Sequence, residues 1–154
     1  MPSPPLVPAD PAFAARVRDS FARQNAMALI GARLADVGAG RCTIELAPRD
    51  DLTQQHGFVH GGIVGMIADS AGGYAAFSLM PAEASLLTVE YKLNLLAPAR
   101  GDLLIATGTV VKAGRTLSIT RVDVLARDQG RETLIATMQQ TLMTLHDTSD
   151  RRGP

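Results

Sequence analysis

The sequence predicts a single α+β domain in which an antiparallel sheet of five to six strands wraps around one central apolar helix, with an extra helix at the N-terminus. Residues 60–80 are apolar on every side of a helical wheel, which is typical of a buried helix. Apolar and polar residues alternate in segments before and after this helix, as they do in half-buried strands. The turns between the later strands are short, which indicates antiparallel neighbours. A sheet that curls around the helix buries the apolar faces of both.

Length and composition are those of a globular single domain. The 154 residues, 46% of them hydrophobic, can bury one substantial core but are too few for two comfortable domains. With 15 basic and 15 acidic residues the formal net charge is zero, which excludes a general attraction to nucleic acid or to an anionic membrane. Cys42 is the only cysteine, so an internal disulfide and a thiolate zinc cluster are excluded. The N-terminus lacks the pattern of a secretory signal, so we expect a cytoplasmic protein.

The ends of the chain are expected to lie outside the domain. We divide the sequence into a proline-rich flexible arm (1–9), the domain (10–146) and a charged flexible tail (147–154). Asp10 followed by Pro11 is typical of a helix start with an aspartate N-cap. An apolar stripe then predicts one amphipathic helix over residues 11–30, which Gly31 ends.

The strands are expected from their alternation. They cover residues 42–46, in a hairpin with the segment before them, and then 87–95, 102–111, 116–126 and 132–145. In the segment 87–95 the odd-numbered residues are apolar and should form the buried side, which leaves Thr88 on the polar side. The apolar side changes between Ile119 and Val122, which predicts a bulge or a strong twist. The last segment is apolar on both sides, so it should lie inside the sheet or against another subunit.

The apolar helix contains one charged residue, and pairs of glycines lie before and after it. Asp69 has no Lys or Arg in this helix to pair with, and isolating a carboxylate costs several kcal/mol unless it is hydrogen-bonded, protonated or functional. Gly61, Gly62, Gly72 and Gly73 each cost about 1 kcal/mol relative to alanine inside a helix, so we expect something to approach the backbone closely. A structural aspartate and simple tight packing are the alternatives. A membrane span is disfavoured by the central acid and by the lack of flanking cations.

Gly61 and Asp69 together suggest chemistry on a carbonyl group. The first N–H groups of a helix have no internal partner and carry the positive end of its dipole, and Gly61 and Gly62 would let a ligand oxygen reach them, as in an oxyanion hole. Asp69 supplies a carboxylate that can attack or activate water. Eight residues of helix span about 12 Å, whereas reacting atoms must come within ~3–3.5 Å. If both groups take part, they come from different subunits, and the site lies on a two-fold axis.

These residues also resemble a known family. The His-Gly-Gly motif at residues 60–62, followed nine residues after the histidine by Asp69, resembles the hot-dog-fold acyl-CoA thioesterases. The similarity is to the PaaI-like thioesterases and to the 4-hydroxybenzoyl-CoA thioesterase of the same subgroup. It extends from about residue 40 to residue 145 and includes the strand 88–94, which leads into Ala-Pro-Ala, and the segment 112–117.

The resemblance implies a hot-dog fold and the hydrolysis of acyl-CoA thioesters to a free acid and CoA. The N–H of Gly61 would polarise the thioester carbonyl, and Asp69 of the other subunit would be the nucleophile or the general base for water. Gln54 falls where these proteins carry an amide that orients water or the carbonyl. Thr88 matches a hydroxyl that holds the water in some members, although an ordinary exposed threonine fits equally well. Asp69 must be ionised in either role, so hydrogen bonds must offset the rise in pKa that burial causes.

Further residues near the helix start and the acid complete the implied site. His60 would shape the helix entrance, with a structural role favoured over proton transfer. Gly62 would help to admit the carbonyl, and Gly73, where some members carry a hydroxyl, would leave room for an aryl or a short- to medium-chain acyl group. His56 and His60 lie four residues apart, but Gly57 argues against a helical metal pair. We expect no metal and no cofactor, because CoA is part of the substrate.

The expected partners are the acyl-CoA substrate and further copies of the chain, with no nucleic acid and no membrane. Lys112 and Arg115, in a predicted turn, are candidates to bind the CoA phosphates, with Arg100 as a third, although a charged turn is also typical of simple solvation. We expect a homodimer, and the two-sided apolar strands also permit a homotetramer. The alternatives are a non-catalytic acyl-CoA-binding protein of the same fold and, less consistent with the His-Gly-Gly motif, a hot-dog dehydratase.

Overall fold

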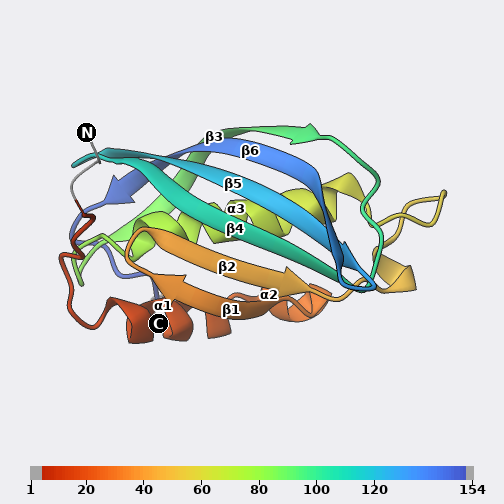
Figure 1. Ribbon diagram of the computed structural model, residues 1–154. Helices are drawn as coiled ribbons and strands as arrows, with labels where there is room; N and C mark the ends of the chain where they lie inside the picture. Colours follow the sequence, from red (N-terminus) through yellow and green to blue (C-terminus); the bar gives the residue numbers. More distant parts are fainter. Residues whose placement is uncertain (1–4, 152–154) are drawn as a thin grey trace.

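The computed structural model describes residues 5–151, which form one six-stranded antiparallel sheet curled around a long helix (Figure 1). The helices in this part of the chain are α1 (Phe13–Ala22), α2 (Asn25–Ile30) and α3 (Gly61–Phe77), and a short 3-10 turn, η1, spans Asp50–Leu52. The strands are β1 (Arg33–Gly38), β2 (Arg41–Leu46), β3 (Ser85–Leu95), β4 (Leu103–Ala113), β5 (Leu117–Asp128) and β6 (Arg131–Leu145). They lie in the order β1-β2-β4-β5-β6-β3. The predicted architecture is confirmed, and so is the position of the last strand inside the sheet.

The outermost parts of the predicted arm and tail, residues 1–4 and 152–154, lie outside the described residues. The described part of the C-terminal segment runs beside α1, where Asp150 pairs with Arg23 at 2.9 Å.

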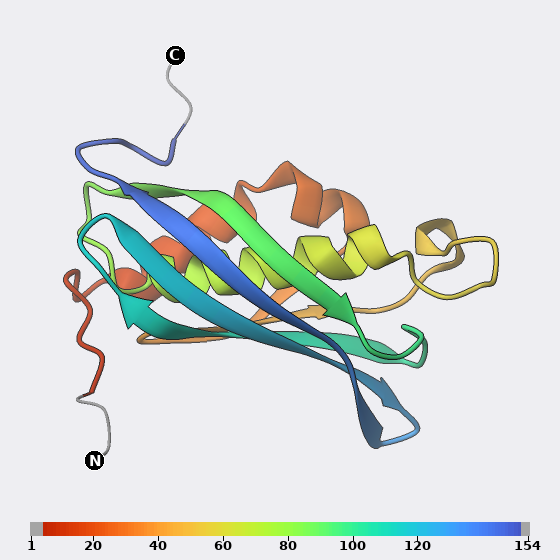
Figure 2. The same cartoon turned by 90° about the horizontal axis from the view of Figure 1, so that it is seen from above.

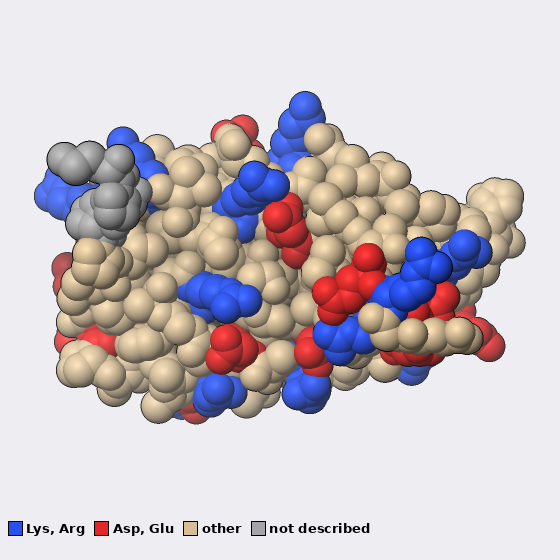
Figure 3. All heavy atoms as spheres, viewed as in Figure 1, with Lys and Arg blue, Asp and Glu red and all other residues tan. Residues whose placement is uncertain are grey.

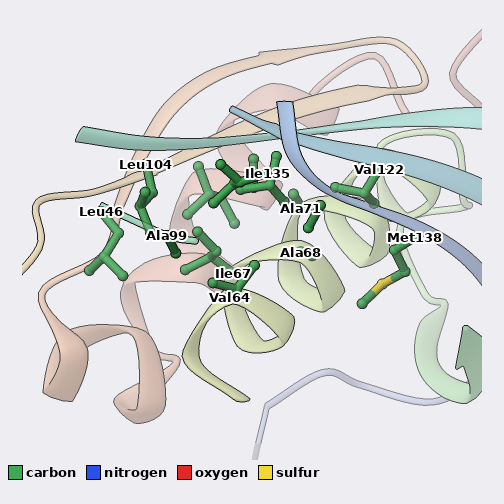
Figure 4. Close-up of a cluster of buried hydrophobic side chains, with 14 of the residues drawn as sticks. Leu46, Val64, Ile67, Ala68, Ala71, Ala99, Leu104, Val122, Ile135 and Met138 are labelled. Carbon is green, nitrogen blue, oxygen red and sulfur yellow. The ribbon is translucent and has the colours of Figure 1, made fainter. Parts of the chain in front are cut away.

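The core lies between α3 and the concave face of the sheet (Figure 4). Val64, Ile67, Ala68 and Ala71 of α3 are fully buried against it, and burying each larger aliphatic side chain contributes about 1.5–3 kcal/mol. Helix and sheet approach closely at Gly108 of β4, where a Cβ would overlap the Ala71 carbonyl. The apolar helix predicted from residues 60–80 is therefore the central core element.

The prediction of one continuous helix over residues 11–30 is wrong, because the segment contains two helices. Gln24, between α1 and α2, has an extended backbone with φ −82° and ψ 92°. Helix α1 buries only Val17 fully, whereas the break turns α2 so that Met27 and Ile30 enter the core. Packing of a second apolar face has overridden the helical continuity that the local sequence favours.

The expected N-cap, Asp10, lies two residues before Ala12, where α1 is capped, but its Oδ1 accepts a hydrogen bond of 2.8 Å from the Ala12 N–H, as a capping aspartate does. Its Oδ2 also pairs with Arg16 at 3.0 Å. The Arg16 guanidinium donates to the carbonyl oxygens of Phe77, Met80 and Pro81 at 3.1, 2.7 and 3.0 Å. Phe77 is the last residue of α3, and Met80 and Pro81 follow it. The carbonyls of Phe77 and Pro81 also accept from the backbone N–H groups of Met80 and Ala84. Arg16 therefore fixes the end of the central helix from the neighbouring helix α1.

Strand β3 does not keep the uninterrupted alternation that its sequence predicts. Its register against β6 shifts between Thr88 and Glu90, which is a β-bulge. Thr88 faces α3, whereas Leu87 and Val89 are 58% and 57% exposed. The placement of Thr88 on the outer side was therefore wrong, because the bulge changes which residues of the strand face the helix.

The bulge predicted between Ile119 and Val122 is found at this point of the sheet, but the apolar side of β5 does not change there. In β5 the even-numbered residues stay on the buried side, including Ser118 and Thr120, and Ile119 lies on the outer side. The register shift lies in β4, directly opposite this point. Two hydroxyl groups therefore occupy inward positions where an apolar pattern was expected.

Candidate active site

The carboxylate of Asp69 points from the third turn of α3 toward β3 and β6. Its Oδ1 accepts a hydrogen bond of 2.7 Å from the Thr88 hydroxyl and a second one from Nε2 of Gln140. The Gln140 amide also donates to the backbone carbonyl of Asp69 at 3.1 Å. Within residues 5–151 no donor contacts Oδ2. One carboxylate oxygen is thus held by the protein, and the other is left for a ligand.

Burial raises the pKa of the Asp69 carboxyl above its ordinary value, and the hydrogen bonds from Thr88 and Gln140 oppose the rise. A partly desolvated carboxylate is a stronger base than an exposed one, while the two donors favour its ionised form. Asp69 therefore has the hydrogen bonds that a functional, ionised carboxylate needs to oppose the effect of burial on its pKa.

A cavity of about 230 Å³ opens beside Asp69, between α1, α3 and the start of β3. The hydroxyls of Ser20 and Tyr74 lie 3.2 Å apart in its wall. Gly73 also lines the cavity, and a Cβ built on it would meet only Leu86 Cδ1, at 3.8 Å. Gly73 therefore leaves open space next to the carboxylate rather than serving a tight contact.

Sequence reasoning missed two residues near Asp69. Gln140 on β6 and Thr120 on β5 are 1% and 0% exposed, and the Thr120 hydroxyl donates to Oε1 of Gln140 at 3.0 Å. A signal was available, because Gln140 stands between Met138 and Leu142 on the buried side of its strand. A polar side chain in such a position must find a partner, so these positions were candidates for the site.

The N-terminus of α3 presents a second polar feature. His60 is the N-cap, and its Nδ1 accepts a hydrogen bond of 2.8 Å from the N–H of Gly62. The N–H of Gly61 has no acceptor among residues 5–151. Gly61 lines a shallow hollow together with Gln54 and Leu95, and Oε1 of Gln54 accepts from a backbone N–H of its own loop. Gly61 therefore has a free donor at the positive end of the helix dipole, whereas the donor of Gly62 is occupied.

Within one chain the structure does not bring Asp69 and Gly61 together. They lie on the same helix, eight residues or about 12 Å apart, and they line different cavities. Thr88 and Gly73 share the cavity of Asp69, whereas Gln54 shares the hollow of Gly61. One small substrate can touch both groups only if a second copy of the chain supplies one of them.

The cations considered for CoA lie at opposite ends of β3. Lys112 and Arg115 are exposed near the hairpin that joins β4 to β5, at the end where β3 begins. Arg100 follows the other end of β3 and lines a hollow that shares Ala97 and Pro98 with the hollow of Gly61. Figure 3 shows basic and acidic side chains interspersed over the face that it presents. Of these three cations, Arg100 is the one that lies near Gly61 of the same chain.

The histidines do not form a metal pair in the structure. His56 and His60 are both exposed, and Nδ1 of His60 is engaged by the helix N-terminus. Across residues 5–151 no group of three or more His, Cys, Asp or Glu side chains is placed to hold a metal ion. None of the described helices is long and apolar enough to span a membrane.

Comparison with known proteins places this architecture in a family. The profile of the Thioesterase superfamily matches residues 56–133, half of the chain. A solved thioesterase family protein from Silicibacter pomeroyi is 51% identical, with a TM-score of 0.86 over 87% of this chain and 98% of that one. Human acyl-coenzyme A thioesterase 13 is 27% identical over 101 residues, which are 64% of this chain and 70% of the human protein. The E. coli PaaI protein, from the phenylacetic acid degradation operon, shares the fold at 18% identity, with a TM-score of 0.79 over 88% and 95% of the two chains.

The fold and these relatives define a hot-dog-fold enzyme that hydrolyses thioesters, as the His-Gly-Gly motif and the strand pattern had predicted. The chain belongs to the Thioesterase superfamily.

Proposed function

We propose that the chain hydrolyses small aryl- or short- to medium-chain acyl-CoA thioesters as a homodimer with two sites. The carboxylate of Asp69 in one subunit faces the N–H of Gly61 in the other, with the thioester between them. The observation that carries this proposal is the half-satisfied carboxylate of Asp69, with Oδ1 held by Thr88 and Gln140 and Oδ2 free beside a cavity.

The chemistry follows from the two free groups. The Gly61 N–H donates to the thioester carbonyl oxygen and stabilises the negative charge that develops there. Either Oδ2 of Asp69 takes a proton from water as the water oxygen attacks the carbonyl carbon, or Oδ2 attacks directly and water then hydrolyses the mixed anhydride. In both routes the C–S bond breaks and CoA leaves as the thiolate, which takes up a proton. Both require the ionised form of Asp69.

An exposed apolar edge supports the dimer. Strand β3 lies at the edge of the sheet (Figure 2), and its side chains Leu87, Val89 and Leu95 are 57–58% exposed. A long apolar strand with unpaired backbone groups is a template for pairing with another chain. Leu87 and Val89 lie on the outer side of the first half of the strand, whereas Leu95 lies beside Gly61. A second β3 that pairs with it antiparallel would continue the sheet and reduce the exposure of these side chains.

The same pairing would bring the two halves of the site together. Asp69 lies beside the first half of β3, where Thr88 contacts it, and Gly61 lies beside the last residue, Leu95. Antiparallel pairing across a two-fold axis sets the first half of one β3 beside the last half of the other. Each Asp69 then approaches Gly61 of the partner subunit, which one chain cannot achieve alone.

The cavity beside Asp69 limits the acyl group. A cavity of about 150 Å³ accommodates benzene, so the 230 Å³ here has room for a substituted ring or a short chain. In the antiparallel dimer, Lys112 and Arg115 of one subunit and Arg100 of the other would both border the thioester. Replacing a cation that binds the CoA phosphates should raise KM for acyl-CoA but not for the matching acyl-pantetheine, which lacks the nucleotide phosphates.

The first test measures thiol release from a panel of aryl- and alkyl-CoA thioesters by wild type and by Asp69→Asn. We expect the variant to remain folded, because Asn still offers Oδ1 to Thr88 and Gln140, and to lose at least about 100-fold in kcat/KM. Retained hydrolysis would dismiss the role of Asp69. Binding without turnover by the wild type would favour the acyl-CoA-binding alternative.

The second test asks whether the site is shared between subunits. Gly61→Pro removes the N–H at a helical position that tolerates proline, and Gly61→Ala is its control, because it keeps the N–H and adds a Cβ 2.6 Å from Leu95 Cδ1. Refolding equal amounts of Asp69→Asn and Gly61→Pro gives mixed dimers that contain one intact shared site. We expect about a quarter of wild-type activity to return, from random pairing of two inactive chains. A site within one chain would give no recovery.

A further inference from the structure

We infer that Gln140 is a positioning residue for the Asp69 carboxylate and that the hydroxyl of Thr120 anchors its amide. The inference rests on the proposed function, because it concerns the carboxylate assigned there. It extends the site beyond the helix and β3 to two buried side chains on β5 and β6.

The amide of Gln140 has one orientation in which both its nitrogen and its oxygen form hydrogen bonds with the neighbouring groups. Nε2 contacts three acceptors, which are Oδ1 of Asp69, the Asp69 carbonyl at 3.1 Å and the Thr88 hydroxyl oxygen at 3.2 Å. Oε1 instead meets the hydroxyl of Thr120 at 3.0 Å, and only a donor satisfies it. A flipped amide would place Oε1 against the carboxylate and leave the Thr120 proton without its acceptor. The acceptor oxygens of Asp69 therefore set the direction of the amide, and the Thr120 hydroxyl anchors it by donating to Oε1.

The helix is shaped to admit this amide. A Cβ on Gly72 would overlap Oε1 of Gln140 and would lie 2.8 Å from Oγ1 of Thr120. A buried amide stabilises a fold only when its polar atoms are paired, and here both are paired with Thr120 and with the carboxylate. Gly72, the Gln140 amide and the Thr120 hydroxyl therefore contact one another, and the amide connects them to Oδ1 of Asp69.

The arrangement distinguishes the two oxygens of the carboxylate. Oδ1 receives two donors, from Thr88 and Gln140, whereas Oδ2 receives none among residues 5–151. The carboxylate is thereby fixed in rotation, and Oδ2 is the oxygen available for attack or for taking a proton. The donors also favour the ionised form against the effect of burial.

Few other ionisable groups border the same cavity. Tyr74 on α3 is hydrogen-bonded to Ser20 of α1, and Asp150 of the C-terminal segment is paired with Arg23. Strand β3 contributes to the cavity wall only Ser85, Leu86 and Thr88, none of which titrates near neutral pH. A change in the acid limb of the rate profile therefore reports on Asp69 and its donors.

The test replaces Thr120 with Val, which removes the hydroxyl at nearly constant volume, and uses Thr120→Ser as the conservative rescue. We expect Thr120→Val to lower kcat about tenfold, to leave KM nearly unchanged and to move the acid limb of kcat to higher pH. Thr120→Ser should restore both. The control is Thr43→Val, which removes a buried hydroxyl that contacts Thr107 at 3.2 Å, away from Asp69. Thr43→Val should leave the acid limb of the pH profile of kcat unchanged.

A titration of the Asp69 carboxyl carbon by NMR gives a readout that needs no substrate, and its midpoint should lie at higher pH in Thr120→Val than in wild type. The inference would be overturned if Thr120→Val and Thr43→Val had the same acid limb of kcat and the same midpoint of the Asp69 titration. If Asp69→Asn is inactive while Thr120→Val behaves as the control, only the positioning role fails. If Asp69→Asn keeps its activity, the proposed function fails first, and the NMR midpoint alone then decides whether Thr120 acts on the carboxylate.

Discussion

Gly72 of α3 lies directly against the buried amide of Gln140 on β6, so closely that a Cβ on the glycine would overlap Oε1. The neighbouring glycine, Gly73, has no such contact and instead borders the cavity of Asp69. Each of these adjacent glycines costs the helix about 1 kcal/mol relative to alanine. Gly72 makes room for the Gln140 amide, whereas Gly73 keeps the cavity open.

This difference predicts opposite effects of the same substitution. Gly72→Ala should lower the melting temperature and reduce hydrolysis at least about tenfold, because Gln140 must move away from Asp69. Gly73→Ala should raise the free energy of unfolding by up to about 1 kcal/mol and raise KM for the larger acyl groups, since its Cβ enters the cavity. Thermal unfolding and kcat/KM on the thioester panel measure both. Similar behaviour of the two variants would contradict the assignment.

Arg16 should contribute strongly to stability although it lies outside the site. Arg16→Met removes the donor to three carbonyls at the end of α3 and should lower the free energy of unfolding by about 2 kcal/mol. Arg18→Met, on the exposed side of the same helix, is the control and should change it by less than about 0.5 kcal/mol. Urea unfolding of the two variants is the measurement, and equal effects would show that the helix-end contacts contribute little.

The pKa of Asp69 predicts how stability depends on pH. Because burial raises this pKa, the folded protein holds the proton more tightly than the unfolded chain does. Ionising Asp69 therefore lowers stability as pH rises from about 4, the value in an unfolded chain, to the raised folded value. Asn does not titrate, so the stability of Asp69→Asn relative to wild type should increase through this window and then level off. Urea unfolding at a series of pH values checks it, and a difference that stays constant would argue against a raised pKa.

Cys42 should be inert in the native protein. Burial, with a smaller contribution from the nearby charge of Asp36, raises the pKa of its thiol to about 12, and the thiolate is the reactive form. We expect a disulfide reagent to label it only after unfolding, so that assays of CoA release carry no background from the enzyme. Stoichiometric labelling of the folded protein at neutral pH would contradict this.

The edge strand predicts a link between assembly and activity. Val89→Lys places a charge in the exposed apolar row that Leu87 and Val89 form on β3 and should dissociate the dimer, with hydrolysis falling in parallel because Asp69 loses the partner's Gly61. Val111→Lys is the control, since Val111 is 65% exposed on β4 and lies outside that row. Sedimentation velocity, with circular dichroism to verify folding, gives the outcome and also separates dimer from tetramer. A dissociated Val89→Lys that retains full activity would rule out the shared site.

Much of the fold could be predicted from local patterns. The stretch 60–80 is apolar on every side, so only burial inside a sheet accommodates it, and the alternation of the flanking segments supplies that sheet. The lone charge of Asp69 within this stretch identified the candidate site, because a buried carboxylate without a cation needs another explanation. The length of helix between it and Gly61 predicts that, if both groups act on one substrate, they come from different subunits.

Tertiary structure decided the remainder, since it depends on contacts between residues distant in the chain. The bulge in β3 turned Thr88 toward Asp69, and no local pattern encodes a register shift against β6. Gln140 and Thr120 looked like polar residues of ordinary strands until the sheet closed over α3 and placed them against Gly72. Periodicity reports which side of an element is buried, but a hydrogen bond needs two elements in register, and register is set only when the whole core packs.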